Sequence, residues 1–139
     1  MTAITDHPAA PATPQGRARA QRAEALELAN LVRLARACWR RRLATRPDAI
    51  ASRDLAAEIL EDVPEVLAGM DLGDLLGACK GVGPRGVERL ARAASVRPSK
   101  TLRALTPRQR AMLIGALRLR NRHAHARDLE ARVEPPVAE

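Results

Sequence analysis

The chain has 139 residues, enough for one domain with tails, and carries a formal net charge of +8 with a sequence pI near 11.2. It contains 28 Ala and 18 Leu but no Phe, no Tyr and a single Trp, a composition that favours packed helices over strands. Two cysteines make no disulfide framework and no zinc site. No apolar run approaches the ~20 residues of a membrane span, and the scarcity of aromatic rings disfavours single-strand binding by base stacking.

The charge is sorted along the chain into blocks. Residues 1–16 are rich in Pro, Ala and Thr and predict a disordered head, whereas residues 17–46 carry +7 and predict a basic helix. Residues 47–79 carry −7 and residues 80–122 carry +11, and together they predict one helical domain. Residues 123–139 carry −2 and predict a C-terminal tail. Two basic stretches flanking an acidic one indicate an anionic partner, nucleic acid first and a membrane surface second.

The predicted helix over residues 17–46 has no Gly after Gly16 and no Pro before Pro47. Its expected apolar face comprises Leu28, Leu31, Val32, Ala35, Trp39 and Leu43. An adjacent basic stripe comprises Arg22, Arg33, Arg36 and Arg40, of which Arg33, Arg36 and Arg40 are predicted to bind the anionic partner. A solvated stripe without that role is the alternative. We expect a monomer, with self-association through Leu26 and Leu34 left open because both lie off the apolar face.

Shorter helices are predicted over residues 47–79, and no stretch has a strand pattern. Pro47 and Asp48 open the first of these helices, and Asp62–Glu65 has the pattern of an N-cap and first turn. Asp71 is placed to cap a third helix, which carries Leu72, Leu75, Leu76 and Cys79.

A hairpin of helices is predicted over residues 75–117. Gly81 can adopt a left-handed cap, and Pro84 suits the first position of a helix that exposes Arg85, Arg89 and Arg92. Ser99 is a predicted N-cap of a further helix. The run Thr106-Pro107-Arg108-Gln109 is a capping-box pattern. The last helix is expected to bury Met112, Leu113, Ile114 and Leu117.

This hairpin is suited to phosphate. A Gly-x-Gly turn lets backbone N–H groups approach an anion, and the helix that follows adds its positive N-terminal dipole. A helix start at Ser99 would supply a second contact. The alternative is that the glycines only make a tight turn. The predicted binding residues of the hairpin are Lys80, Gly81, Val82, Gly83, Arg85, Arg89, Ser99, Lys100, Thr101 and Arg103.

The same stretch resembles the helix–two-turn–helix of actinobacterial-type integration host factor, a nucleoid-associated family that binds double-stranded DNA. The resemblance rests on Leu75-Leu76, Gly69-Met70, Gly81-Val82-Gly83, the run from Pro98 to Leu105, and Arg108-Gln109-Arg110. It covers residues 66–117 well and the first helix loosely. Lys100 and Thr101 stand where the family has paired arginines, Arg103 keeps the third basic position, and Ala104 replaces a glycine.

Other function classes fit less well. A small-subunit ribosomal protein uses a similar hairpin on rRNA, but it has a basic C-terminal tail where this one is acidic. DNA glycosylases share the hairpin, but their Pro-Glu start and zinc finger are absent here. His123 and His125 are two residues apart, a spacing that splays metal ligands on a helix, and no nucleophile–base pair is present. We therefore expect no enzyme, no metal and no cofactor; a helical protein-interaction adaptor is a further alternative.

The sequence thus predicts an all-α protein, a long basic N-terminal helix laid against a compact bundle with a helix–two-turn–helix. We expect it to bind double-stranded DNA largely without sequence preference, to bend or organise it, and to use no small-molecule substrate and no membrane. Help to site-specific recombination or DNA topology is implied by the resemblance alone. No secretion signal is visible, so a place in the cytoplasm is expected, and the resemblance implies a place on the nucleoid.

Overall fold

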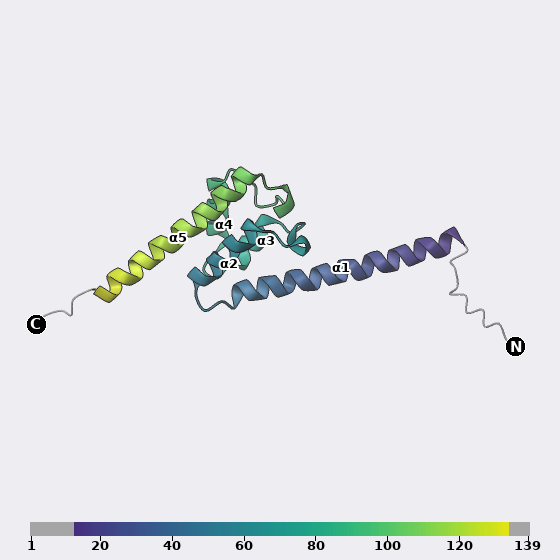
Figure 1. The fold of residues 1–139 in the computed structure, drawn as a ribbon, viewed down its shortest axis with the longest axis horizontal. Coiled ribbons are helices and arrows are strands. Elements are labelled where there is room, and N and C mark those ends of the chain that lie inside the picture. The colour runs from purple at the N-terminus through teal and green to yellow at the C-terminus, as the bar shows by residue number, and fades with distance from the viewer. Residues whose placement is uncertain (1–12, 134–139) are drawn as a thin grey trace, which may run out of the picture. The chain divides into compact units, whose positions relative to one another are not determined.

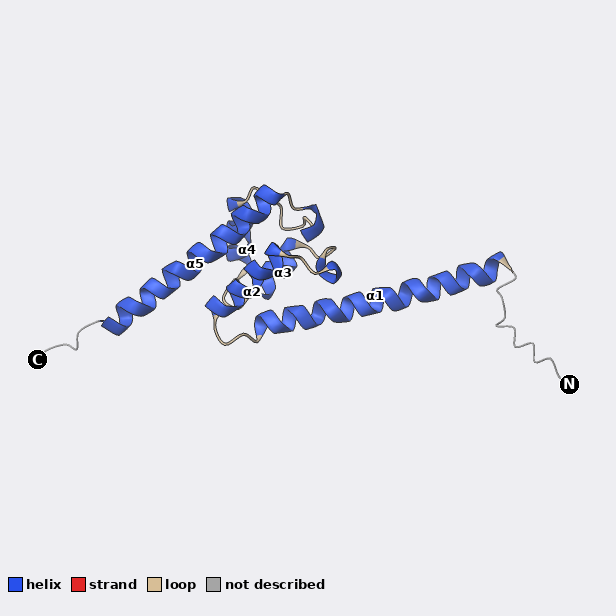
Figure 2. Ribbon diagram, in the orientation of Figure 1, coloured by secondary structure: helices blue, strands red, loops and turns tan. Residues whose placement is uncertain are grey.

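A computed structural model describes residues 13–133 of the chain. In this part the protein is all-α, as predicted, with helices joined by short loops (Figure 2). The elements are α1 (Pro14–Ala44), α2 (Ala49–Glu61), the 3-10 turn η1 (Glu65–Leu67), α3 (Leu72–Ala78), α4 (Pro84–Ala93), the 3-10 turn η2 (Leu102–Ala104) and α5 (Pro107–Val133). The described residues contain no strand beyond a single antiparallel bridge between Asp71 and Thr101.

The chain divides into two compact units, one ending at Leu34 and one beginning at Ala35, so α1 contributes to both. In the first unit Leu26, Leu28, Leu31 and Leu34 are 61–65% exposed. The prediction that Leu28 and Leu31 face a core is therefore wrong, because the core that receives this helix lies in the second unit. There, Leu43 is fully buried and Trp39 packs against the core.

α5 runs along α2 and contacts α4 (Figure 1). Leucine supplies twelve of the twenty buried residues in the core of the second unit. The largest fully buried side chains of this core are Leu43, Leu60, Leu67, Leu72, Leu75, Leu76, Leu90, Leu102, Leu113 and Leu117. Asp48 caps α2, its Oδ1 accepting from the Ala51 amide at 2.7 Å. Such caps are needed because the first amides of a helix have no partner inside it.

Several predicted boundaries differ from the structure. Asp62 is the C-cap of α2 instead of an N-cap, since Pro64 directly precedes η1. Asp71 does sit at the N-cap of α3, but its side chain makes no capping hydrogen bond. α1 begins at Pro14, three residues before the predicted start, and α5 continues through residues 123–133, where a tail was predicted. The rest of the predicted head and tail, residues 1–12 and 134–139, lies outside the described residues.

The C-terminal end of α4 is closed by a Schellman motif. The Val96 amide donates to Ala91 O at 2.9 Å, and the Ser95 amide donates to Arg92 O at 3.0 Å. Ser95 takes φ 54°, the left-handed conformation that this motif requires. The chain then leaves α4 as loop, and the helix predicted to begin at Ser99 does not form: residues 98–100 make a turn, and η2 begins only at Leu102.

Candidate nucleic-acid interface

The turn between α3 and α4, which we call the first turn (residues 80–83), has the conformation that its glycines predict. Gly81 has φ +81°, and a Cβ there would lie 3.1 Å from Ala49 Cβ, so both backbone and space require glycine. Gly83 is the N-cap of α4 and Pro84 its first residue. Because Gly83 has no side-chain cap, the amides of Arg85 and Gly86 open α4 without a partner in the described hydrogen bonds.

A cleft of about 500 Å³ opens beside the first turn. We call it the arginine cleft, and its lining is Arg53, Gly81, Gly83, Arg85, Gly86, Arg89, Arg120 and Arg127. No carboxylate is among these residues. Three elements supply the five guanidinium groups: α2, α4 and α5. An uncapped helix N-terminus and five guanidinium groups in one space make a site for a phosphate or another anion.

Arg53 forms the deep part of this cleft, with only 8% of its surface exposed. Its Nε donates to Asn121 Oδ1 at 2.7 Å, and Asn121 Nδ2 donates to Asp54 Oδ1 at 2.6 Å and to Ile50 O at 3.2 Å. This network fixes the guanidinium in place. No hydrogen bond within the described residues engages its two terminal nitrogens, and Nη1 lies 4.0 Å from the position of a Cβ on Gly81.

Arg120 lies half-buried in the same cleft. Burial lowers the pKa of its guanidinium, and the neighbouring charges of Arg53 and Arg89 lower it further. Both effects arise because the guanidinium of Arg120 is partly removed from water and lies close to other positive charges. An anion in the cleft would relieve the repulsion among these three side chains.

The second turn of the hairpin, residues 98–105, is closed by its own backbone. The Leu102 amide donates to Met70 O at 2.9 Å and the Arg103 amide to Ala68 O at 2.8 Å. In return, Lys100 O accepts from the Leu72 amide at 2.9 Å. Two of the backbone amides that a helix start at Ser99 would have offered to phosphate, those of Lys100 and Leu102, are therefore engaged inside the protein.

The capping box at the start of α5 also holds this second turn. The Gln109 amide donates to Thr106 Oγ1 and the Thr106 amide donates to Gln109 Oε1, both at 3.1 Å, as the sequence pattern predicted. Gln109 Oε1 also accepts from Lys100 Nζ at 3.0 Å. The Lys100 ammonium group is therefore engaged in a contact within the protein. Ser99 and Arg103 are exposed, and Thr101 is half-buried where it forms the bridge to Asp71.

The remaining predicted binding residues have different surroundings. Val82 is buried in the core, so its side chain cannot reach a ligand, and exposed Lys80 approaches Arg46 O with Nζ at 3.4 Å. Arg36 Nε donates to Val66 O at 3.1 Å, and its Nη2 covers Gly69. Arg36 therefore anchors the end of α1. Arg33 and Arg40 are exposed on the same helix, Arg33 in the first unit and Arg40 in the second.

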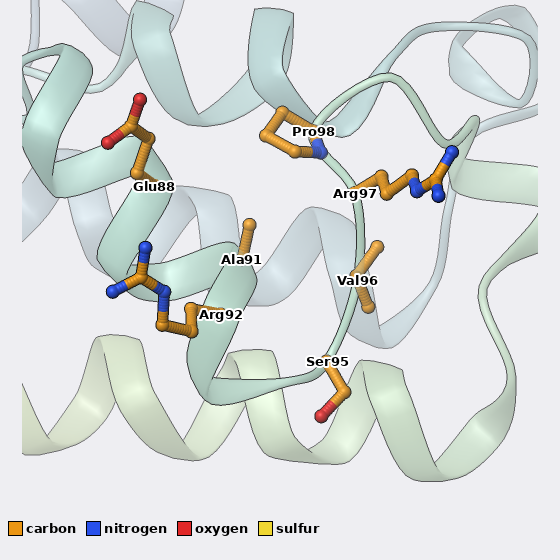
Figure 3. A pocket seen from close by; sticks show the side chains of 7 residues that line it. All are labelled: Glu88, Ala91, Arg92, Ser95, Val96, Arg97 and Pro98. Atoms are coloured by element: carbon orange, nitrogen blue, oxygen red, sulfur yellow. The ribbon is translucent and has the colours of Figure 1, made fainter.

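A second hollow of about 400 Å³ lies between α4 and the loop that follows it (Figure 3). Ala91 and Val96 are its buried apolar residues, while Glu88 and Arg92 project from α4 and Arg97 from the loop. Because Glu88 brings a negative charge, this hollow suits phosphate less well than the arginine cleft does.

Arg53, Arg120 and Arg127 line the arginine cleft but were not among the binding residues predicted from the sequence. Arg53 is the one base in the acidic stretch 47–79, and it falls on the buried face of its helix beside Ser52 and Ala56. Arg120 and Asn121 continue the buried stripe of Leu113 and Leu117. A charged residue on an apolar stripe was the available signal for both. Arg127 was missed because a tail was predicted in its place.

Neither a metal centre nor a membrane span is found in residues 13–133. No three or more His, Cys, Asp or Glu side chains there are grouped to hold a metal ion. None of the described helices combines the length and apolarity needed to cross a bilayer.

Comparison with known proteins yields one similarity, and it concerns the fold. No family model matches the chain, and no curated protein matches it. Among solved structures, the chain is similar to sIHF bound to an 8bp palindromic DNA, with a TM-score of 0.52 and 24% sequence identity. The similarity covers 66% of this chain and 98% of that chain. The chain therefore has an sIHF-like all-α fold.

Proposed function

We propose that this protein binds double-stranded DNA through the first turn and the arginine cleft, largely without sequence preference. The observation that carries the proposal is the cleft itself, where five arginines and no carboxylate surround an uncapped helix N-terminus. Phosphate contacts of this kind set affinity and position but do not distinguish bases. The sIHF-like fold supports the proposal, because that protein was solved bound to DNA.

The choice of duplex over single strands follows from composition. The chain has one aromatic residue, Trp39, which packs against the core and stacks under Arg42, with 4.3 Å from the guanidinium to the ring centroid. It is therefore not available for base stacking, on which single-strand binders rely. Regularly spaced phosphates on a stiff duplex are the better match to fixed guanidinium groups.

Fluorescence anisotropy with labelled random-sequence duplexes tests this function. Unlabelled duplex DNA, single-stranded DNA and double-stranded RNA serve as competitors at physiological salt. Duplex DNA should compete best, and unrelated duplexes should compete equally. Stronger competition by double-stranded RNA would favour the rRNA-binding alternative, and no binding to any of the three would favour the protein-interaction adaptor.

Bending and organisation of DNA, and with them a place on the nucleoid, form the finer part of the proposal. Exposed arginines of α1, among them Arg22 and Arg33, would give the chain a second phosphate contact in addition to the cleft. Holding a duplex at two places offsets the elastic cost of bending, about 1–6 kcal/mol for a substantial bend. A role in site-specific recombination or in DNA topology would depend on that bend.

End-to-end energy transfer on a short labelled duplex measures bending at saturating protein. The matched variant lacks residues 1–34, because the second compact unit begins at Ala35 and its core needs Trp39 and Leu43. We expect this variant to bind more weakly and not to bend. Equal bending by both proteins would remove α1 from the DNA contact.

A further inference from the structure

The arginine cleft is deeper and more positively charged than contact with a DNA backbone requires. Arg85, Arg89 and Arg127 are exposed at its rim, whereas Arg53 is almost fully buried and Arg120 half-buried. A duplex is a wide, stiff ligand whose phosphates reach rims more easily than recesses. Each phosphodiester also brings a single negative charge, against five guanidinium groups in one space.

The more deeply buried of the two recessed groups, Arg53, is held in its orientation by side chains of the protein. Arg53 is held through Nε by Asn121, which is itself held by Asp54 and Ile50. Its Nη1 lies 4.0 Å from the position that a Cβ on Gly81 would take. Preorganised guanidinium groups of this kind bind compact phosphate oxygens well, because little side-chain entropy is lost on binding.

We propose that the arginine cleft binds a free oligophosphate of the pyrophosphate class, with Arg53 and Arg120 as its inner ligands. Two linked phosphates carry several negative charges in a volume that fits the cleft, and they reach the recess and the rim together. The amides of Arg85 and Gly86 at the start of α4 provide further donors. Since the rim belongs to the proposed DNA surface, the oligophosphate competes with DNA; this competition, unlike the binding itself, rests on the proposed function.

Titration calorimetry of the full-length protein with sodium pyrophosphate tests the binding. Sodium sulfate at matched ionic strength is the reference anion, because it is multiply charged but lacks the second linked group. We expect one pyrophosphate per chain and an affinity at least about tenfold above that for sulfate, as charge-assisted hydrogen bonds to several guanidinium groups imply. Equal affinities for the two anions would overturn the proposal.

Arg120→Gln should weaken pyrophosphate binding by about tenfold or more, since it removes an inner ligand. Arg132→Gln is the matched control, the same substitution at the exposed end of the same helix. Arg127→Gln, at the rim, provides a second measurement if circular dichroism shows that Arg120→Gln unfolds the protein; it should weaken binding more than the control. Equal loss in the cleft variants and the control would assign the effect to net charge and reject the site.

Displacement of labelled duplex then tests the competition. Pyrophosphate should release DNA at concentrations where sulfate of equal ionic strength does not. If pyrophosphate binds by calorimetry but releases no more DNA than sulfate, the competition is rejected while the site stands. If DNA never binds, the proposed function fails and the calorimetry still decides the oligophosphate site.

Discussion

The first turn (residues 80–83) and the second turn (residues 98–105) lie at opposite ends of α4 and use their backbone amides differently. In the first turn, Gly81 and Gly83 leave the start of α4 uncapped and facing a cleft. In the second, the amides of Leu102 and Arg103 bond to the segment before α3. Within the first turn itself, the Lys80 amide donates to Ser52 Oγ at 2.9 Å and the Val82 amide donates to Cys79 O at 3.2 Å, so the amides at the start of α4 that have no partner within the described residues are those of Arg85 and Gly86. We therefore propose that DNA binds at the first turn, whereas the second turn mainly stabilises the fold.

The largest expected effect is a difference in thiol reactivity between the two cysteines. Cys79 is buried directly before the first turn, whereas Cys38 is exposed. Burial raises the pKa of the Cys79 thiol to about 11, against opposing effects of a hydrogen bond with Ser52 and the charge of Arg53. A raised pKa keeps the thiol protonated near pH 7, and the thiolate is the reactive form. Cys79 should therefore react with a disulfide reagent at least about a hundredfold more slowly than exposed Cys38. Equal reaction rates of Cys79 and Cys38 in the native protein would mean that the first turn opens often enough to expose Cys79.

Charge reversal distinguishes the two turns by DNA affinity. Arg89→Glu at the arginine cleft should weaken duplex binding by roughly a hundredfold, because it adds repulsion where several groups share the phosphates. Arg103→Glu on the second turn should weaken it by about tenfold, since Arg103 acts as a single exposed side chain. Both variants should keep the helical circular dichroism signal. A larger effect at Arg103 would reverse the assignment of the two turns.

The two glycines of the first turn provide a matched pair for stability. Gly81→Ala should lower the free energy of unfolding by about 1–2 kcal/mol, because alanine is strained at positive φ and its Cβ would crowd Ala49. Gly83 has extended backbone and open space around it, so Gly83→Ala should change stability much less. Urea unfolding measures both. Equal losses would show that the left-handed conformation is not what Gly81 supplies.

The capping box tests the structural role of the second turn. Thr106→Ala removes the hydroxyl that accepts from the Gln109 amide and should cost about 1 kcal/mol of stability. DNA affinity should change less than twofold, because Thr106 lies outside the arginine cleft. A variant as stable as the parent protein would show that the box does not hold the turn.

Local patterns in the sequence predicted the helices and most of the first turn. Gly81, Pro84 and the Thr106–Gln109 box each determine their backbone through nearby residues, and the structure confirms all three. Long-range partners could not be predicted in the same way. The bonds from residues 102 and 103 to residues 70 and 68 join segments whose proximity only the folded core determines.

The site was accordingly predicted in part. Arg85 and Arg89 follow the glycines in sequence and were predicted, whereas Arg53 and Arg120 reach the cleft from α2 and α5, and each lies more than 25 residues from the first turn in sequence. Arg36 shows the reverse case, a predicted DNA contact whose side chain has a partner inside the protein. Its place on an arginine stripe predicted a DNA contact, but its guanidinium meets Val66 O within the second unit. Helical periodicity gives the face of a helix but not the segment that the face meets.

The salt dependence of duplex binding tests most directly the claim that the first turn binds phosphate. The logarithm of the binding constant should fall linearly with the logarithm of salt concentration, with a slope of about −0.9 for each phosphate neutralised. Arg89→Gln should reduce the magnitude of that slope by about one, and Arg132→Gln should leave it unchanged. A shallow slope for the parent protein, or an unchanged slope for Arg89→Gln, would contradict the account.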